Sequence, residues 1–74
     1  METFLTINEL ADMLGVDENV ILRFMSANLL ESFMKMDGRY LIPYQTAQRL
    51  SIDYSDGSTS IFYRGTKVYE EVMN

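Results

Sequence analysis

The side chains that most often carry out enzymatic chemistry are missing from this sequence. It contains neither histidine nor cysteine, which removes the usual general base, the commonest metal ligand and any thiolate. Carboxylate, lysine, tyrosine and hydroxyl groups remain, but no pair of them forms a recognisable catalytic motif. A domain of 74 residues also has little room for a deep pocket. We therefore expect no enzymatic activity, no metal site and no cofactor.

The charged side chains could instead form a binding surface, and their balance is acidic. Eleven acidic residues face six basic ones, which gives a net charge of -5. This charge argues against broad attraction to nucleic acid or anionic lipid and favours solubility or a basic partner. No apolar run approaches the roughly 20 residues needed to cross a bilayer, and the N-terminus lacks the basic start of a signal peptide. We expect a cytoplasmic protein that does not enter membranes.

Two helices that would position these charges are predicted near the N-terminus. Thr6 and Glu9 have the spacing of a capping box, and Gly15 is suited to end the helix that follows. Asp17 is a plausible cap for the second helix, and Asn28 can close it. The apolar faces of the two helices consist of Ile7, Leu10, Ala11 and Leu14, and of Ile21, Phe24 and Met25. The short turn between them predicts a helix-turn-helix unit.

A β-hairpin and a third helix should follow. Asp37-Gly38 is a strong signal for a two-residue type I′ turn between strands 33–36 and 39–42. Alternation predicts one side with Met34, Met36, Tyr40 and Ile42, and another with Lys35, Arg39 and Leu41. Pro43 would start the third helix, with Ala47 and Leu50 facing inward.

The segment 51–74 differs in character from the rest of the chain. Residues 56–60 have the composition of a loop, and residues 61–63 could form a short strand. From Thr66 onward a helix is preferred, because Val68, Tyr69, Val72 and Met73 fit an apolar stripe, although a hairpin around Arg64-Gly65 is the alternative. We predict a core of residues 1–50, with residues 51–74 as an extension packed on or beside it.

The order helix, tight turn, helix, hairpin, helix is typical of a winged helix-turn-helix, an α+β fold with a two-stranded wing. The sequence of residues 5–43 resembles the excisionase and MerR-like branch of this fold. The resemblance rests on Leu5-Thr6, Glu9-Leu10-Ala11, Leu14-Gly15-Val16, Arg23, and the stretch Lys35-Met36-Asp37-Gly38-Arg39-Tyr40 followed by Ile42-Pro43. The end of this motif is fairly specific, whereas its front half is shared by many helix-turn-helix proteins.

The resemblance implies a function. Members of this family are small DNA-binding proteins, often from phages or other mobile elements, that direct recombination or regulate promoters. The second helix would enter the major groove of double-stranded DNA, and the wing would touch the backbone or minor groove. Transferred to this sequence, the DNA-facing positions are Glu18, Asn19, Val20, Leu22 and Arg23, with Lys35, Asp37 and Arg39 on the wing. The DNA contacts predicted from these positions are Asn19, Arg23, Lys35 and Arg39.

The front of the second helix departs from the family pattern. Ser or Thr followed by Arg or Lys is typical there, but this sequence has Asp17, Glu18 and Asn19. Asn19 could bind adenine, whereas the carboxylate of Glu18 would repel phosphates, which supply most of the affinity. Arg23 and the two wing cations could neutralise about three phosphates, so weak binding is expected. The alternative is that these cations are solvated and paired with nearby carboxylates.

A second function remains open beside DNA binding. By helical phase, Leu22 points away from Ile21 and Phe24, and with Val20 it would form an apolar patch near Glu18. Such a surface suits an acidic winged-helix protein that acts through another protein, for example a phage-encoded inhibitor or adaptor of a nucleic-acid enzyme, or through a second copy of itself as a homodimer. The competing explanation is that residues 51–74 fold over the patch.

Overall fold

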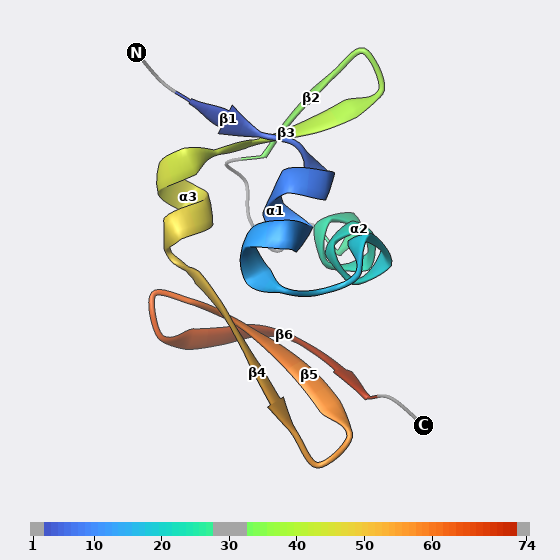
Figure 1. Ribbon diagram of the computed structural model, residues 1–74, viewed down its shortest axis with the longest axis vertical. Helices are drawn as coiled ribbons and strands as arrows, with labels where there is room; N and C mark the ends of the chain where they lie inside the picture. The colour runs from blue at the N-terminus through green and yellow to red at the C-terminus, as the bar shows by residue number, and fades with distance from the viewer. Residues whose placement is uncertain (1–2, 28–32, 73–74) are drawn as a thin grey trace.

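The chain forms a mixed α+β fold, which confirms the predicted class (Figure 1). The structure is a computed structural model and describes residues 3–27 and 33–72. Within these residues there are three helices and two three-stranded antiparallel sheets. The elements in chain order are β1 (Phe4–Leu5), α1 (Ile7–Leu14), α2 (Glu18–Ser26), β2 (Met34–Met36), β3 (Arg39–Pro43), α3 (Tyr44–Gln48), β4 (Leu50–Ser55), β5 (Ser58–Tyr63) and β6 (Thr66–Val72).

Helices α1 and α2 begin where the capping signals predict. The Thr6 amide donates to the Glu9 carboxylate at 3.0 Å, and the Glu9 amide donates to the Thr6 hydroxyl at 3.2 Å. Gly15 ends α1 with a φ of 72°, a left-handed conformation that glycine adopts without steric cost. Asp17 caps α2 by accepting a 2.8 Å hydrogen bond from the Asn19 amide. Helix α2 ends at its cap Ala27, and the predicted closing residue Asn28 lies outside the described residues.

The predicted hairpin is present, but its faces differ from the prediction. Strands β2 and β3 pair in the first sheet, whose strand order is β1-β3-β2. Asp37 and Gly38 form the turn between them, both at positive φ. Lys35 lies opposite Tyr40 and Met36 lies opposite Arg39, and directly opposite residues share a face of a sheet. The side chains of Lys35 and Arg39 therefore leave the backbone on opposite faces of the hairpin. The predicted alternation was wrong because the two residues that flank a two-residue turn pair with each other.

The C-terminal segment forms a second sheet in the order β4-β5-β6. The helix predicted from Thr66 is wrong, and the alternative hairpin around Arg64-Gly65 is correct. The loop predicted for residues 56–60 shrinks to a turn of Asp56-Gly57, and Thr59 and Ser60 are buried in β5.

The two halves of the molecule share one apolar core. Leu10 and Ile21 from the helices are fully buried together with Ile61 from β5, and Leu50 is nearly so. Helix α3 contributes Ala47, as predicted, whereas Leu50 is buried as predicted but belongs to β4, because the helix ends at Gln48. The core also contains Ala11, Val20, Phe24, Met25 and Ile42. The second sheet therefore packs against the helices, below them in Figure 1.

None of the helices in the described part of the chain combines the length and the apolar composition needed to cross a membrane.

Candidate functional site

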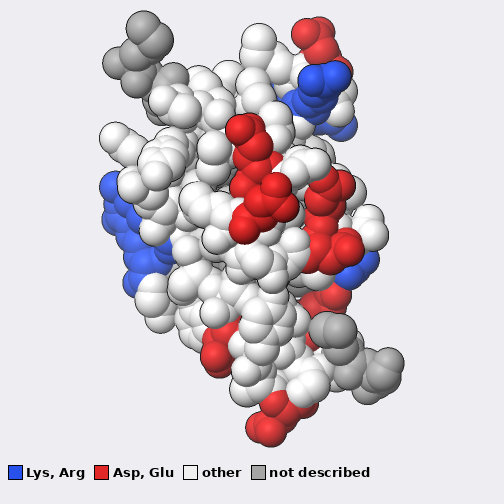
Figure 2. Space-filling model, viewed as in Figure 1, with Lys and Arg blue, Asp and Glu red and all other residues white. Residues whose placement is uncertain are grey.

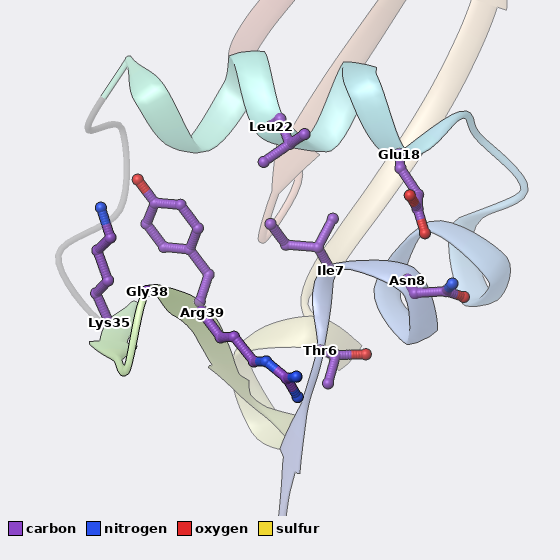
Figure 3. Close-up of a pocket in the computed structure, with 9 residues that line it drawn as sticks. Thr6, Ile7, Asn8, Glu18, Leu22, Lys35, Gly38 and Arg39 are labelled. Carbon is purple, nitrogen blue, oxygen red and sulfur yellow. The ribbon is translucent and has the colours of Figure 1, made fainter.

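A groove of about 540 Å³ opens between the start of α1, helix α2 and the β2–β3 hairpin (Figure 3). Its position follows from the tight α1–α2 turn, which places the front of α2 above the start of α1, with the hairpin closing the third side. The residues that line it are Thr6, Ile7, Asn8, Glu18, Leu22, Lys35, Gly38, Arg39 and Tyr40.

The centre of the groove is apolar. Leu22 on α2 and Ile7 on α1 point toward each other across it (Figure 3). Leu22 is 39% exposed, so the predicted outward orientation of this side chain is confirmed. Ile7 and Tyr40 are half-buried and pack against the core, which makes the floor of the groove continuous with it.

The charged residues of the groove are separated by sign. Glu18 lies at one end beside Asn8 and Lys35 lies at the other end, whereas the guanidinium of Arg39 points toward Thr6 between them (Figure 3). The Lys35 ammonium is 5.4 Å from the centre of the Tyr40 ring, a cation–π distance. Neither basic residue forms an ion pair with a carboxylate among residues 3–27 and 33–72. Both cations are therefore available to a ligand.

Arg23, the third predicted cation, does not line the groove. Its guanidinium donates two hydrogen bonds of 2.7 Å to the Glu71 carboxylate on β6. The hydroxyl of Tyr69 donates to the same carboxylate at 2.9 Å. The hydrogen bond from Arg23 lowers the pKa of Glu71, and burial raises the pKa of Tyr69, with Glu71 adding to that effect. Arg23, Lys35 and Arg39 are consequently not brought together into one basic surface.

The structure separates two residues that the sequence grouped. Val20, predicted to be exposed beside Leu22, is only 9% exposed and belongs to the core. It lies four residues before Phe24 on the same side of α2, and the Phe24 ring is 5.7 Å from the ring of Tyr69 in β6. The second sheet therefore covers this side of α2. Asn19 is exposed at the front of α2 but outside the groove.

Two parts of the groove were missed by the sequence analysis. Ile7 was assigned to the apolar face of the first helix and Tyr40 only to one side of the hairpin, and the turn between the helices brings Ile7 opposite Leu22. The polar residues Thr6 and Asn8 at the start of α1 gave no binding signal, because Thr6 was explained by its capping role.

Acidic side chains dominate the face of the molecule shown in Figure 2. They extend across the middle of this face, over α1 and α2, whereas the basic side chains lie toward its edges. No group of three or more carboxylates that could hold a metal ion occurs in the part of the chain that the structure describes.

Comparison with known proteins gives no family for this chain. No protein-family model matches it, and no match was found among curated proteins or solved structures.

Proposed function

We propose that this chain is a small acidic protein of winged helix-turn-helix type that acts by protein–protein interaction, as an inhibitor or adaptor. The order α1, tight turn, α2 and β2–β3 hairpin supports the winged helix-turn-helix classification. The observation that carries the functional proposal is the groove, in which exposed Leu22 faces Ile7 between ends of opposite charge.

The charges of the groove define the segment that it would bind. An apolar side chain would pack between Leu22 and Ile7, because both present apolar surface to the groove. A basic residue on one side of it would meet Glu18, and an acidic residue on the other side would meet Lys35. An amphipathic segment of a partner protein, bound in a groove as helices commonly are, has this chemistry.

The same surface is poorly suited to DNA as its main ligand. Arg23 is bound to Glu71, and the two cations that line the groove share it with the carboxylate of Glu18. Glu18 lies on the face that would approach the DNA backbone and would repel it. Since phosphate contacts supply most of the affinity for DNA, a protein partner agrees better with this geometry.

The proposal is tested by site-specific crosslinking. A photoreactive amino acid at position 22 should capture a protein from a nuclease-treated host extract, whereas the same group at exposed position 13 on α1 should not. The captured protein is then purified, and its affinity is measured for Leu22→Asp and for the control Met13→Asp. We expect a large loss of affinity for Leu22→Asp alone. Equal effects of the two substitutions, or no protein captured at position 22, would contradict the proposal.

A second candidate is duplex DNA binding of excisionase type. It is supported by the resemblance of residues 5–43 and by Lys35 and Arg39, which border the groove without an ion pair among the described residues. Asn19 would be the base-contacting residue on α2. This candidate predicts that Lys35→Gln with Arg39→Gln abolishes binding to a labelled duplex at low salt. Unchanged binding of that double variant would count against it.

A further inference from the structure

An arginine occupies a backbone conformation that arginine seldom adopts. The hairpin turns in the described residues are Asp37-Gly38, Asp56-Gly57 and Arg64-Gly65, and each has positive φ at both positions. Asp tolerates the left-handed conformation because its short side chain can hydrogen-bond locally. Arg64 has no such local compensation at its φ of 53°. The fold therefore accepts strain to place a guanidinium at the tip of the β5–β6 turn.

A second arginine lies beside the first. The Arg64 amide donates a 2.9 Å hydrogen bond to the Arg49 carbonyl, which continues the ladder in which Leu50 lies opposite Tyr63. Two arginines therefore lie at neighbouring backbone positions, Arg49 at the end of α3 and Arg64 in the β5–β6 turn. The guanidinium of Arg64 lies 5.8 Å from the centre of the Tyr63 ring, a contact that restricts its position.

Nothing among the described residues neutralises this pair. Neither Arg49 nor Arg64 forms an ion pair with a carboxylate there, although the chain has eleven acidic residues. Lys67, just after the turn, is instead paired with Glu70 at 3.3 Å. Backbone strain at an exposed arginine that forms no ion pair among the described residues indicates a functional rather than a stabilising role.

The arginine pair is separate from the groove. In Figure 1 the β5–β6 turn lies at the left edge of the molecule, whereas α2 and the β2–β3 hairpin lie on the right. Figure 2 shows basic side chains at that left edge, away from the carboxylates in the middle of the face. A polyanion that follows this edge would avoid the acidic surface over α1 and α2.

We propose that Arg49 and Arg64 bind the phosphate backbone of a nucleic-acid strand. The planar guanidinium matches phosphate oxygens with two parallel hydrogen bonds, and exposed arginines at neighbouring backbone positions, at the end of α3 and in the β5–β6 turn, can reach a nucleic-acid backbone without a shaped pocket. This inference does not depend on the protein partner proposed for the groove. It proposes a nucleic-acid contact at the end of α3 and the β5–β6 turn rather than at the β2–β3 hairpin.

The test compares two double variants that each remove two positive charges. Fluorescence anisotropy measures the binding of short labelled single-stranded and duplex DNA of random sequence at several low salt concentrations. Arg49→Gln with Arg64→Asn should lose most of the binding to both forms and reduce the salt slope for duplex DNA by about 2. Lys35→Gln with Arg39→Gln should retain most of the binding. Asn suits the left-handed turn position, so the first variant should fold at least as stably as the parent, as a thermal melt would show.

Three results would overturn the proposal. They are the absence of binding by the parent protein at the lowest salt, an equal loss in both double variants, and competition by polyglutamate as effective as that by unlabelled DNA. The last result would show that the arginine pair takes carboxylates. Leu22→Asp should bind DNA like the parent protein, so failure of the groove proposal is distinguishable from failure of this one.

Discussion

The guanidinium of Arg23 on α2 and the carboxylate of Glu71 on β6 form a two-hydrogen-bond ion pair across 48 positions of sequence. Glu71 is the more buried partner, with 19% of its side chain exposed against 54% for Arg23. Together with the Phe24–Tyr69 ring contact, the ion pair holds the last strand against α2. It also occupies one of the three cations that the sequence analysis assigned to DNA contact.

The first prediction concerns the energetic coupling between these two residues. Arg23→Gln and Glu71→Gln should each lower the free energy of unfolding, and the double variant should lose less than the sum of the two, because both remove the same contact. Urea denaturation measures all four proteins. The exposed pair of Lys67 and Glu70 provides a control cycle, in which we expect little coupling. Additive losses at Arg23 and Glu71 would show that the ion pair does not stabilise the fold.

The second prediction is an acid-sensitive stability. The pKa of Glu71 is lowered from its ordinary value of 4.5, chiefly by the hydrogen bond from Arg23. A carboxyl group whose pKa is lower in the folded state contributes its full stabilisation above 4.5 and loses it as the pH falls through the folded-state value. Unfolding free energies measured from neutral pH downward should therefore fall more steeply for the parent than for Arg23→Gln. Parallel curves would contradict this assignment.

The third prediction distinguishes two neighbours on α2. Val20→Asp should destabilise the protein by about 3 kcal/mol or more, because it places an unpaired carboxylate in the core. Leu22→Asp should change stability by less than about 1 kcal/mol, since Leu22 is partly exposed in the groove. Chemical denaturation of both variants provides the measurement. Similar losses at the two positions would mean that the assigned burial of α2 is wrong.

The fourth prediction concerns the cooperativity of the two halves. Ile61→Ala should lower the unfolding free energy by about 2–5 kcal/mol, because Ile61 is fully buried in the core shared with the helices. Helical circular dichroism and tyrosine fluorescence should then report one coincident transition. Tyr40→Phe and Tyr44→Phe are included in both proteins, so that the remaining tyrosines all lie in the second sheet. Helices that persist after this tyrosine signal is lost would indicate two independent units.

Local sequence signals were sufficient for the first half of the fold. The capping box, Gly15 and Asp37-Gly38 act through contacts within a few residues, so their structural effect does not depend on distant parts of the chain. Helices α1 and α2 and the β2–β3 hairpin were predicted for this reason. Strand β1 was not predicted, because its two residues form a strand only by pairing with β3.

The second sheet was harder to predict because its last strand contains an irregularity. Phe62 lies opposite Lys67 and Ile61 lies opposite Tyr69, so Val68 has no direct partner in the ladder. This β-bulge makes Val68 and Tyr69 both half-buried and disrupts the alternation that identifies a strand. The remaining apolar pattern fitted a helix.

The candidate site could be predicted only in part, because it depends on contacts between distant segments. The exposure of Leu22 followed from helical phase alone. The burial of Val20 and the pairing of Arg23 with Glu71 both required the position of β6. The hydrogen bond between the backbones of Arg49 and Arg64 likewise forms only because β4 and β5 pair.

The Tyr54 hydroxyl on β4 donates a 2.9 Å hydrogen bond to the Gly15 carbonyl, at the bend between α1 and α2. This hydrogen bond connects the second sheet to the α1–α2 turn, which determines the distance between Ile7 and Leu22 across the groove. Laboratory evolution toward a different partner should for this reason enrich substitutions in β4 as well as along the groove, and suppressors of a damaged interface should arise at sites remote from it.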